Sequence, residues 1–149
     1  MKHHTKTKGD IGLGCIVVDL MKHDIAPALP MSEHLKFDCI AINEEGKMAR
    51  VSVKYRTKDA RGNVFLHLKS VYADKRGNHI NKHKKSDYEC TAIYCPDTDK
   101  CYYVRNDELD IGSITLRIDK TKNGQVSGIK WAKDYEDPHR IFRKSKKNK

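Results

Sequence analysis

The sequence predicts an α/β protein in which a helix covers one face of a mixed β-sheet. An amphipathic segment with helical spacing comes first, over residues 7–23. Segments that alternate between apolar and polar residues follow it, in the order three strands, a polar loop and two strands. A chain of 149 residues is long enough to bury a core. We expect one domain over residues 1–139 and a basic, disordered tail over 140–149.

The first segment predicts an α-helix. Its apolar residues recur at helical spacing, at Ile11, Cys15, Val18 and Met21. Gly12 and Gly14 lower the helix propensity, and we interpret them as allowing the helix to pack closely on the sheet. They do not form a phosphate-binding loop, because no strand precedes them and no Lys-Ser or Lys-Thr pair follows.

A β-hairpin is expected after the helix. Residues 25–29 form a short extended segment that Pro30 ends. Residues 37–42 and 48–56 then form two strands, and the turn between them contains the Asn and Gly that favour a tight reversal.

The second strand of this hairpin has an apolar face and a polar face. Alternation puts Val51, Val53 and Tyr55 on the first and Arg50, Ser52, Lys54 and Arg56 on the second. Asp38, near the start of the first strand, meets Lys54 at one end of the hairpin. That pair could hold a divalent metal beside a charge stabiliser, as phosphodiester hydrolysis requires. The same residues also fit an ordinary hairpin with one solvated face, although a carboxylate inside an apolar run is costly without a partner.

The remaining elements are strands separated by turns. Residues 63–72 predict a third long strand, and the basic residues 73–87 predict a loop or lid. Residues 89–95 and 101–105 predict a second hairpin. The last expected elements are a helical turn at 107–109, a strand at 114–118, a turn at Gly124 and an apolar segment at 129–132.

The five cysteines do not suggest a disulfide framework, because their number is odd and no secretion signal is visible. Cys95 and Cys101 are separated by five residues and have no matching second pair, whereas zinc sites prefer about two to four. We expect the cysteines in the core or at strand ends. No apolar stretch approaches the roughly 20 residues of a membrane span, so we expect a cytoplasmic protein.

Basic residues are concentrated in the middle of the chain. Residues 47–85 contain twelve Lys or Arg and two acids, whereas residues 1–46 and 86–139 are each net acidic. The basic run begins at the strand that carries Lys54. Basic charge beside a candidate metal site suggests a polyanion held over that site, and a solvated face is the alternative interpretation.

Several segments resemble the PD-(D/E)XK nuclease superfamily and, within it, the homing endonucleases encoded by group I introns. The resemblance covers about residues 7–135, and its motifs follow the family's order: Gly9-Asp10, Ser32 to Asp38, Val51 to Arg56, Ala92 to Asp99 and Ile114 to Arg117. It implies a restriction-endonuclease-like core of the αβββαβ type, with a mixed β-sheet flanked by helices. It also implies a metal-dependent, site-specific endonuclease that hydrolyses double-stranded DNA.

The resemblance assigns roles to particular residues. Asp10 matches the helix acid, usually Glu, and Asp38 matches the metal-binding aspartate. Lys54 matches the motif lysine that orients the attacking water or stabilises the transition state. Mg²⁺, for which Mn²⁺ can substitute, is held by Asp38, Asp10 and the main-chain carbonyl of Val53. Ser52 occupies the variable acid position, where the family has a carboxylate or an amide, and this is a departure from the pattern.

Double-stranded DNA is the expected partner, and the protein is expected to associate with the nucleoid when it is bound. The candidate contacts lie in the basic run and the loop after it: Arg56, Lys58, Arg61, Lys69, Asn78, Lys82, Lys84 and Lys85. The resemblance also implies a homodimer or a homotetramer, because one small domain covers little DNA, and no small-molecule cofactor is expected.

Three alternatives remain open on the sequence alone. One is a Holliday-junction resolvase, which has the same fold and metal site but reads branched DNA by its shape. Another is a DNA-binding relative with weakened catalysis, which Ser52 makes plausible. The third is an HNH nuclease, prompted by His79, Asn81 and His83, but these residues are too close together for that motif.

Overall fold

The computed structural model describes residues 5–82, 87–109 and 112–144. The chain begins with α1 (Thr5–Lys22), a single long helix. A five-stranded sheet follows the order β1-β2-β3-β7-β8. Its strands are β1 (Ala26–Ala28), β2 (Cys39–Ile42), β3 (Met48–Tyr55), β7 (Cys90–Cys95) and β8 (Lys100–Arg105).

The central sheet is mixed, as the sequence predicts. β3 and β7 run parallel, with Ser52 opposite Thr91, while the other neighbouring strands are antiparallel. The β2–β3 hairpin turns at Asn43, whose carbonyl accepts the N–H of Gly46 at 2.9 Å. Gly46 has a φ of 78°, a backbone conformation that glycine adopts at little cost. The expected Asn-Gly reversal is therefore confirmed.

The connection from β3 to β7 passes through strands. A parallel pair needs a long crossover, usually a helix, and the αβββαβ order implies a second α-helix. Among the described residues the crossover instead contains β4 (Asn63–His67), β5 (Lys69–Asp74) and β6 (Gly77–Lys82). β4 pairs with β9 (Ser113–Arg117), and β5 pairs with β6.

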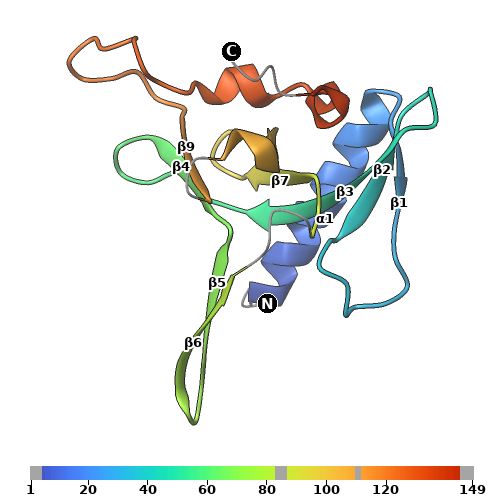
Figure 1. Cartoon of the computed structure of the whole chain (residues 1–149). Helices are drawn as coiled ribbons and strands as arrows, with labels where there is room; N and C mark the ends of the chain where they lie inside the picture. Colours follow the sequence, from blue (N-terminus) through green and yellow to red (C-terminus); the bar gives the residue numbers. More distant parts are fainter. Residues whose placement is uncertain (1–4, 83–86, 110–111, 145–149) are drawn as a thin grey trace.

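Two sequence-based expectations in this crossover were wrong. The strand expected over 63–72 is divided at Leu68, where the chain leaves β9 and enters the β5–β6 hairpin. The loop expected over 73–87 is partly this hairpin, which projects away from the rest of the molecule (Figure 1). The reversal lies at Gly77, with a φ of 117°.

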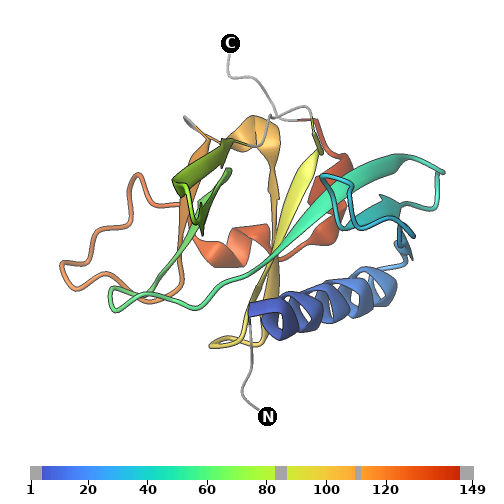
Figure 2. The same cartoon turned by 90° about the horizontal axis from the view of Figure 1, so that it is seen from below.

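Two cores lie on opposite faces of the central sheet. On one face α1 packs its buried residues Ile16 and Leu20 against β2, β3 and β7 (Figure 2). Gly12 lies at this contact, where a Cβ built on it would be 3.5 Å from the Cβ of Tyr55, an ordinary van der Waals distance that an alanine would tolerate. Gly12 thus faces β3 as interpreted, but the contact does not require a glycine, and a Cβ built on Gly14 would meet no described atom within 4 Å beyond the neighbouring helix backbone.

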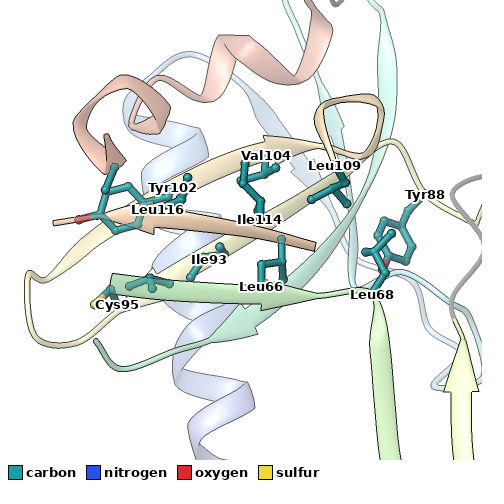
Figure 3. Close-up of a cluster of buried hydrophobic side chains, with 12 residues drawn as sticks. Leu66, Leu68, Tyr88, Ile93, Cys95, Tyr102, Val104, Leu109, Ile114 and Leu116 are labelled. Carbon is teal, nitrogen blue, oxygen red and sulfur yellow. The ribbon is translucent and has the colours of Figure 1, made fainter. Parts of the chain in front are cut away.

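On the other face, β7 and β8 pack against the β4–β9 pair (Figure 3). Side chains of Leu66, Ile93, Val104 and Leu116 fill this core, and Tyr88 closes one end beside Leu68. Cys39, Cys90 and Cys95 are buried in the two cores, and all five cysteines are free thiols. This agrees with their expected place in the core or at strand ends.

Short 3₁₀ helices complete the fold: η1 (Asn106–Glu108), η2 (Ala132–Tyr135) and η3 (Pro138–Phe142). η3 overlaps the start of the expected tail. Ile141 is buried, and the guanidinium of Arg140 pairs with Glu108, so these two residues are part of the folded domain. Within the described ranges, no helix combines the length and apolar character needed to cross a bilayer.

Candidate active site

Asp38 lies just before β2, where its side chain is exposed to solvent. Its main-chain N–H donates to the carbonyl of Val51 at 2.9 Å, which continues the pairing of β2 with β3. Its Oδ2 accepts a hydrogen bond from the main-chain N–H of Val53 at 2.6 Å. The carboxylate is held against β3 and remains accessible, so the burial cost expected from its apolar neighbours does not arise.

The edge of β3 next to Asp38 is open at Val53. β2 pairs with β3 from Met48 to Val51, and no strand of the described residues covers this edge beyond Val51. The N–H and the C=O of one strand residue point to the same edge. Because the N–H of Val53 points to Asp38, its carbonyl faces that side too. A carboxylate and a main-chain carbonyl therefore share one open edge.

Lys54 and Arg56 bring positive charge to the polar side of β3, and both are partly buried. Burial lowers the pKa of the Lys54 ammonium, the charge of Arg56 lowers it further, and Asp38 opposes the shift. Burial also lowers the pKa of the Arg56 guanidinium. Lys54 interacts with the Asp38 carboxylate and with the second cation, Arg56, so this side of β3 carries an excess of positive charge that a phosphate group would neutralise.

Ser52 is buried, with 4% of its surface exposed. Its hydroxyl donates to the Oδ2 of Asp38 at 3.4 Å, a long contact compared with the usual distance of about 2.8 Å. A short, buried hydroxyl in this place is directed at the carboxylate and not at solvent. The structure thus places Ser52, Asp38 and Lys54 together, as the hairpin geometry predicts.

Asp10 is placed differently from these three residues. It is exposed on α1, two residues before Gly12. Each helical residue turns by about 100°, so Asp10 points roughly away from the side that contacts β3. None of the hydrogen bonds or ion pairs found for the described residues joins Asp10 to Asp38 or Lys54. Its role as the helix acid stays a prediction.

The residues around Asp38 fit a hard divalent cation that keeps most of its own water. Within the described ranges, no group of three or more His, Cys, Asp or Glu residues is close enough to form a complete metal cage. Mg²⁺ commonly binds through one or two carboxylates together with water and substrate phosphate. The hydrogen bonds to Asp38 fall on Oδ2, which leaves Oδ1 and the Val53 carbonyl as oxygen donors.

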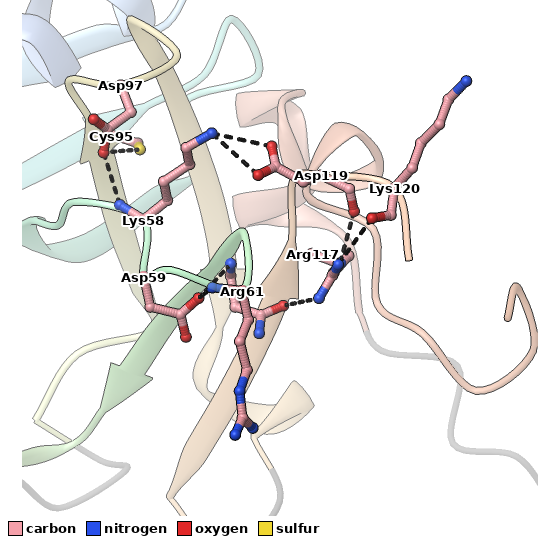
Figure 4. A network of polar contacts seen from close by, with 9 residues as sticks. Lys58, Asp59, Arg61, Cys95, Asp97, Arg117, Asp119 and Lys120 are labelled. Carbon is pink, nitrogen blue, oxygen red and sulfur yellow. Dashed lines mark hydrogen bonds and ion pairs between the residues drawn. The ribbon is translucent and has the colours of Figure 1, made fainter. Parts of the chain in front are cut away.

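Two of the candidate DNA contacts lie in the loop between β3 and β4 (Figure 4). The Lys58 ammonium pairs with the Asp119 carboxylate at 3.1 Å, and its main-chain N–H donates to Asp97 at 2.8 Å. Lys58 therefore joins this loop to the segment after β9. The side chain of Arg61 is exposed and extends away from that network in Figure 4. Both residues stay predicted DNA contacts.

The other candidates belong to the β5–β6 hairpin. Asn78 is exposed beside its turn, next to the exposed Lys75 and Arg76. Lys69 and Lys82 are opposite each other in the strand register, and only their backbone is described. Lys84 and Lys85 lie outside the described residues. That this hairpin contacts DNA stays a prediction. Its projecting shape indicates which part of the basic run would reach the DNA (Figure 1).

Sequence reasoning missed a buried polar group behind Ser52. Thr91 and Asn106 are buried, and the Thr91 hydroxyl donates to the Asn106 side chain at 3.5 Å. Asn106 in turn donates to the carbonyl of Tyr88 at 2.6 Å. Burial raises the pKa of the Tyr88 phenol, and the neighbouring hydroxyls of Thr91 and Ser52 hold back part of that rise. Only the β3–β7 register reveals this group.

Comparison with known proteins places the chain in a family. The family model described as PD-(D/E)XK endonuclease matches residues 3–138. A solved structure titled as that of a bacterial homing endonuclease, I-Ssp6803I, is similar in fold, with a TM-score of 0.75 and 18% sequence identity. The match covers 94% of this chain and 93% of that one. No curated protein sequence was found to match.

The family match spans α1, the β2–β3 hairpin with Asp38 and Lys54, and the core between β7–β8 and the β4–β9 pair. The structural match, at 18% identity, bears on the fold alone, and that fold is restriction-endonuclease-like. The expected superfamily is therefore confirmed: the chain belongs to the PD-(D/E)XK endonuclease family.

Proposed function

We propose that this protein is a Mg²⁺-dependent endonuclease that cuts double-stranded DNA at a specific site, as a homing endonuclease does. The observation that carries the proposal is the exposed Asp38 carboxylate, fixed by the Val53 N–H at 2.6 Å on the open edge of β3. Lys54, on β3, interacts electrostatically with Asp38, and Arg56 lies two residues further along the chain. This is the pairing of carboxylate and cation that metal-assisted phosphodiester hydrolysis uses.

Each residue has a distinct part in the proposed reaction. Asp38 and the Val53 carbonyl hold the cation, which when bound lowers the pKa of a water and offsets charge on the scissile phosphate. Lys54 donates hydrogen bonds to the attacking water or to the phosphate oxygens as charge develops. Arg56 holds a neighbouring phosphate, and Ser52 steadies Asp38 from its buried side.

DNA recognition is proposed to use the β5–β6 hairpin and the loop that carries Arg61. A two-stranded ribbon fits the major groove of B-DNA. The exposed Asn78 lies beside its turn with Lys75 and Arg76, where an amide can read base edges and the cations can contact phosphates. Cutting both strands calls for two active sites, so a homodimer or homotetramer is part of the proposal.

The test is cleavage of a randomised duplex library in Mg²⁺, in Mn²⁺ and in EDTA. Cuts at one recurring sequence, present with either metal and absent in EDTA, support the proposal. A four-way junction of unrelated sequence forms the second substrate. Cleavage of the junction with no sequence preference in the library would favour a resolvase. DNA binding without any cut would identify a relative with lost catalysis, as the serine at position 52 allows.

A further inference from the structure

A basic loop, residues 118–130, follows β9 in a part of the sequence that is otherwise acidic. Residues 86–139 together are net acidic, but this loop contains three lysines and one acid, Asp119. Lys120 and Lys122 are exposed, and among the described residues no ion pair involves either of them. Exposed lysines are common on protein surfaces, so the case for a binding surface depends on how this loop is held.

The 118–130 loop is closed at its base and braced at its start. The main-chain N–H of Arg117 donates to the carbonyl of Lys130 at 2.8 Å, which joins the two ends of the loop. The guanidinium of Arg117 donates to the carbonyls of Asp119 and Lys120 at 2.6 and 2.9 Å. These bonds fix the backbone where the exposed lysines begin. A loop that is already ordered loses less conformational entropy when it binds a partner.

The same segment is joined to the loop between β3 and β4. The carbonyl of Gly62 accepts the main-chain N–H groups of Ile118 and Asp119 at 2.9 and 3.2 Å. The Lys58 ammonium pairs with the Asp119 carboxylate at 3.1 Å (Figure 4). A Cβ built on Gly62 would lie 2.4 Å from Asp119, and the φ of Gly62 is 80°. This contact therefore requires glycine, and it holds the two loops in a fixed relation.

A hollow of about 560 Å³ is lined by residues of both loops. Its basic lining residues are Arg61 from the first loop and Arg117, Lys120 and Lys122 from the segment after β4's partner strand, β9. Asp119 is the acid in the lining, and Lys58 pairs with it. The side chains of Arg61 and Lys120 extend away from the polar network in Figure 4. The hollow thus carries an excess of positive charge.

We propose that the 118–130 loop and the β3–β4 loop form one surface that binds the sugar-phosphate backbone of duplex DNA beside the cut, with Lys120, Lys122 and Arg61 as phosphate contacts. The inference rests on the proposed function. Five residues of chain from Arg56 to Arg61 span at most about 18 Å. Even with long side chains added, these contacts fall within about one turn of the duplex, roughly 34 Å, from the phosphate at Arg56.

The test measures binding of a random-sequence duplex of about 30 base pairs, roughly three turns, in EDTA and over a range of salt. The double variant Lys120→Ala with Lys122→Ala removes two cations from the proposed surface. The matched control is Lys22→Ala with Lys47→Ala, which removes the same charge from exposed positions at the end of α1 and in the β2–β3 turn. Melting temperatures establish that each variant is folded.

The loop variant is expected to weaken binding by about 10-fold in low salt and to lower the slope of log affinity against log salt by about 2, because two phosphate contacts are lost. The control variant should keep the wild-type slope, although its net charge changes by the same amount. Adding Arg61→Ala to the loop variant should lower the slope by about one more, since Arg61 belongs to the same surface.

The outcomes that overturn the inference differ from the one that overturns the proposed function. If the wild-type protein binds the duplex and the loop variant keeps its affinity and slope, only the loop surface is wrong. Equal losses in the loop and control variants would attribute the effect to net charge and also overturn the inference. If the wild-type protein neither binds the duplex in EDTA nor cuts the library in Mg²⁺, the proposed function fails and the inference fails with it.

Discussion

The two faces of β3 differ in the side chains that they bury, apolar on one face and polar on the other. Val51 and Val53 pack against α1 in a core that is almost entirely apolar. Ser52, one residue away, faces a buried polar group, and Lys54 is a partly buried cation beside Arg56. The first face supplies hydrophobic stabilisation. The second face accepts desolvated polar groups, which lowers stability and supplies the groups that hydrolysis requires.

The largest expected effect is on the polar face. Lys54→Met should reduce the cleavage rate by about 10² to 10³, since it removes a charged donor to the transition state. DNA binding should be largely retained, because the other predicted phosphate contacts, such as Arg56 and Arg61, are unchanged. Single-turnover cleavage and filter binding measure the two quantities. Cleavage by Lys54→Met at the wild-type rate would show that Lys54 takes no part in the reaction.

The same substitution has a pH-dependent effect on stability. Burial and Arg56 lower the pKa of Lys54 in the folded state below its ordinary value of 10.5. The unfolded chain therefore holds this proton more tightly, and the charged Lys54 destabilises the fold below its folded pKa. That penalty disappears as the pH rises from the folded pKa to 10.5. Lys54→Met should thus stabilise the protein at pH about 7, and its advantage should shrink near pH 10 in urea titrations.

On the apolar face the expected pattern is reversed. Ile16→Ala empties a fully buried position of α1 and should lower the free energy of unfolding by about 2–5 kcal/mol. The cleavage rate per folded molecule should be unchanged at a temperature where the variant is folded. Val18→Ala on the exposed side of the same helix is the control, with a small effect on stability. A loss of cleavage in folded Ile16→Ala would show that the two faces are coupled.

A third substitution separates the two ends of β3. Arg56→Ala should weaken DNA binding and reduce the slope of log affinity against log salt by about one, because it removes one phosphate contact. Lys47→Ala removes a cation at the opposite end, beside the turn, and should leave the slope unchanged. Lys47 already pairs with Glu45 at 3.1 Å. Equal slopes for both variants would contradict a phosphate contact at Arg56.

The smallest expected effect concerns the close packing of α1. Gly14→Ala adds a methyl group in open space and should stabilise the helix by about 1 kcal/mol. Gly12→Ala adds one that meets Tyr55 and Val53 at 3.5 and 3.6 Å, which is ordinary contact. It should gain at least as much as Gly14→Ala in urea titrations, because its methyl also packs against β3. A loss of stability in Gly12→Ala would mean that the helix packs on β3 more closely than these distances allow.

Local patterns predicted most of the elements and the centre of the site. Alternation along β3 placed Ser52 and Lys54 on one face, and the Asn-Gly turn fixed the hairpin that brings Asp38 beside them. These features depend on residues close in sequence. The break at Leu68 has no glycine or proline to mark it. Gly77, in Arg76-Gly77-Asn78, favours the β5–β6 turn. The many charged residues around it led to the interpretation of this segment as a loop.

The group behind Ser52 could not be predicted for a different reason. Thr91 comes opposite Ser52 through a parallel pairing of strands that are separated by the β4–β6 crossover. The register of such a pair is set by long-range packing and not by neighbouring residues. Tyr88 precedes β7 in the chain and looks like an ordinary core aromatic. Its place in the core, with its main-chain carbonyl accepting a hydrogen bond from Asn106, emerges only after the sheet is assembled.

The proposed function requires the exposed Asp38 carboxylate on the open edge of β3 to hold a metal ion that assists DNA cleavage. The most direct measurement is cleavage of a duplex containing the recurring site by wild-type protein and by Asp38→Asn, with and without Mg²⁺. We expect the wild type to cut only when Mg²⁺ is present, and Asp38→Asn to cut more slowly by at least about 10² with unchanged DNA affinity. Equal Mg²⁺-dependent cleavage by the two proteins would contradict it.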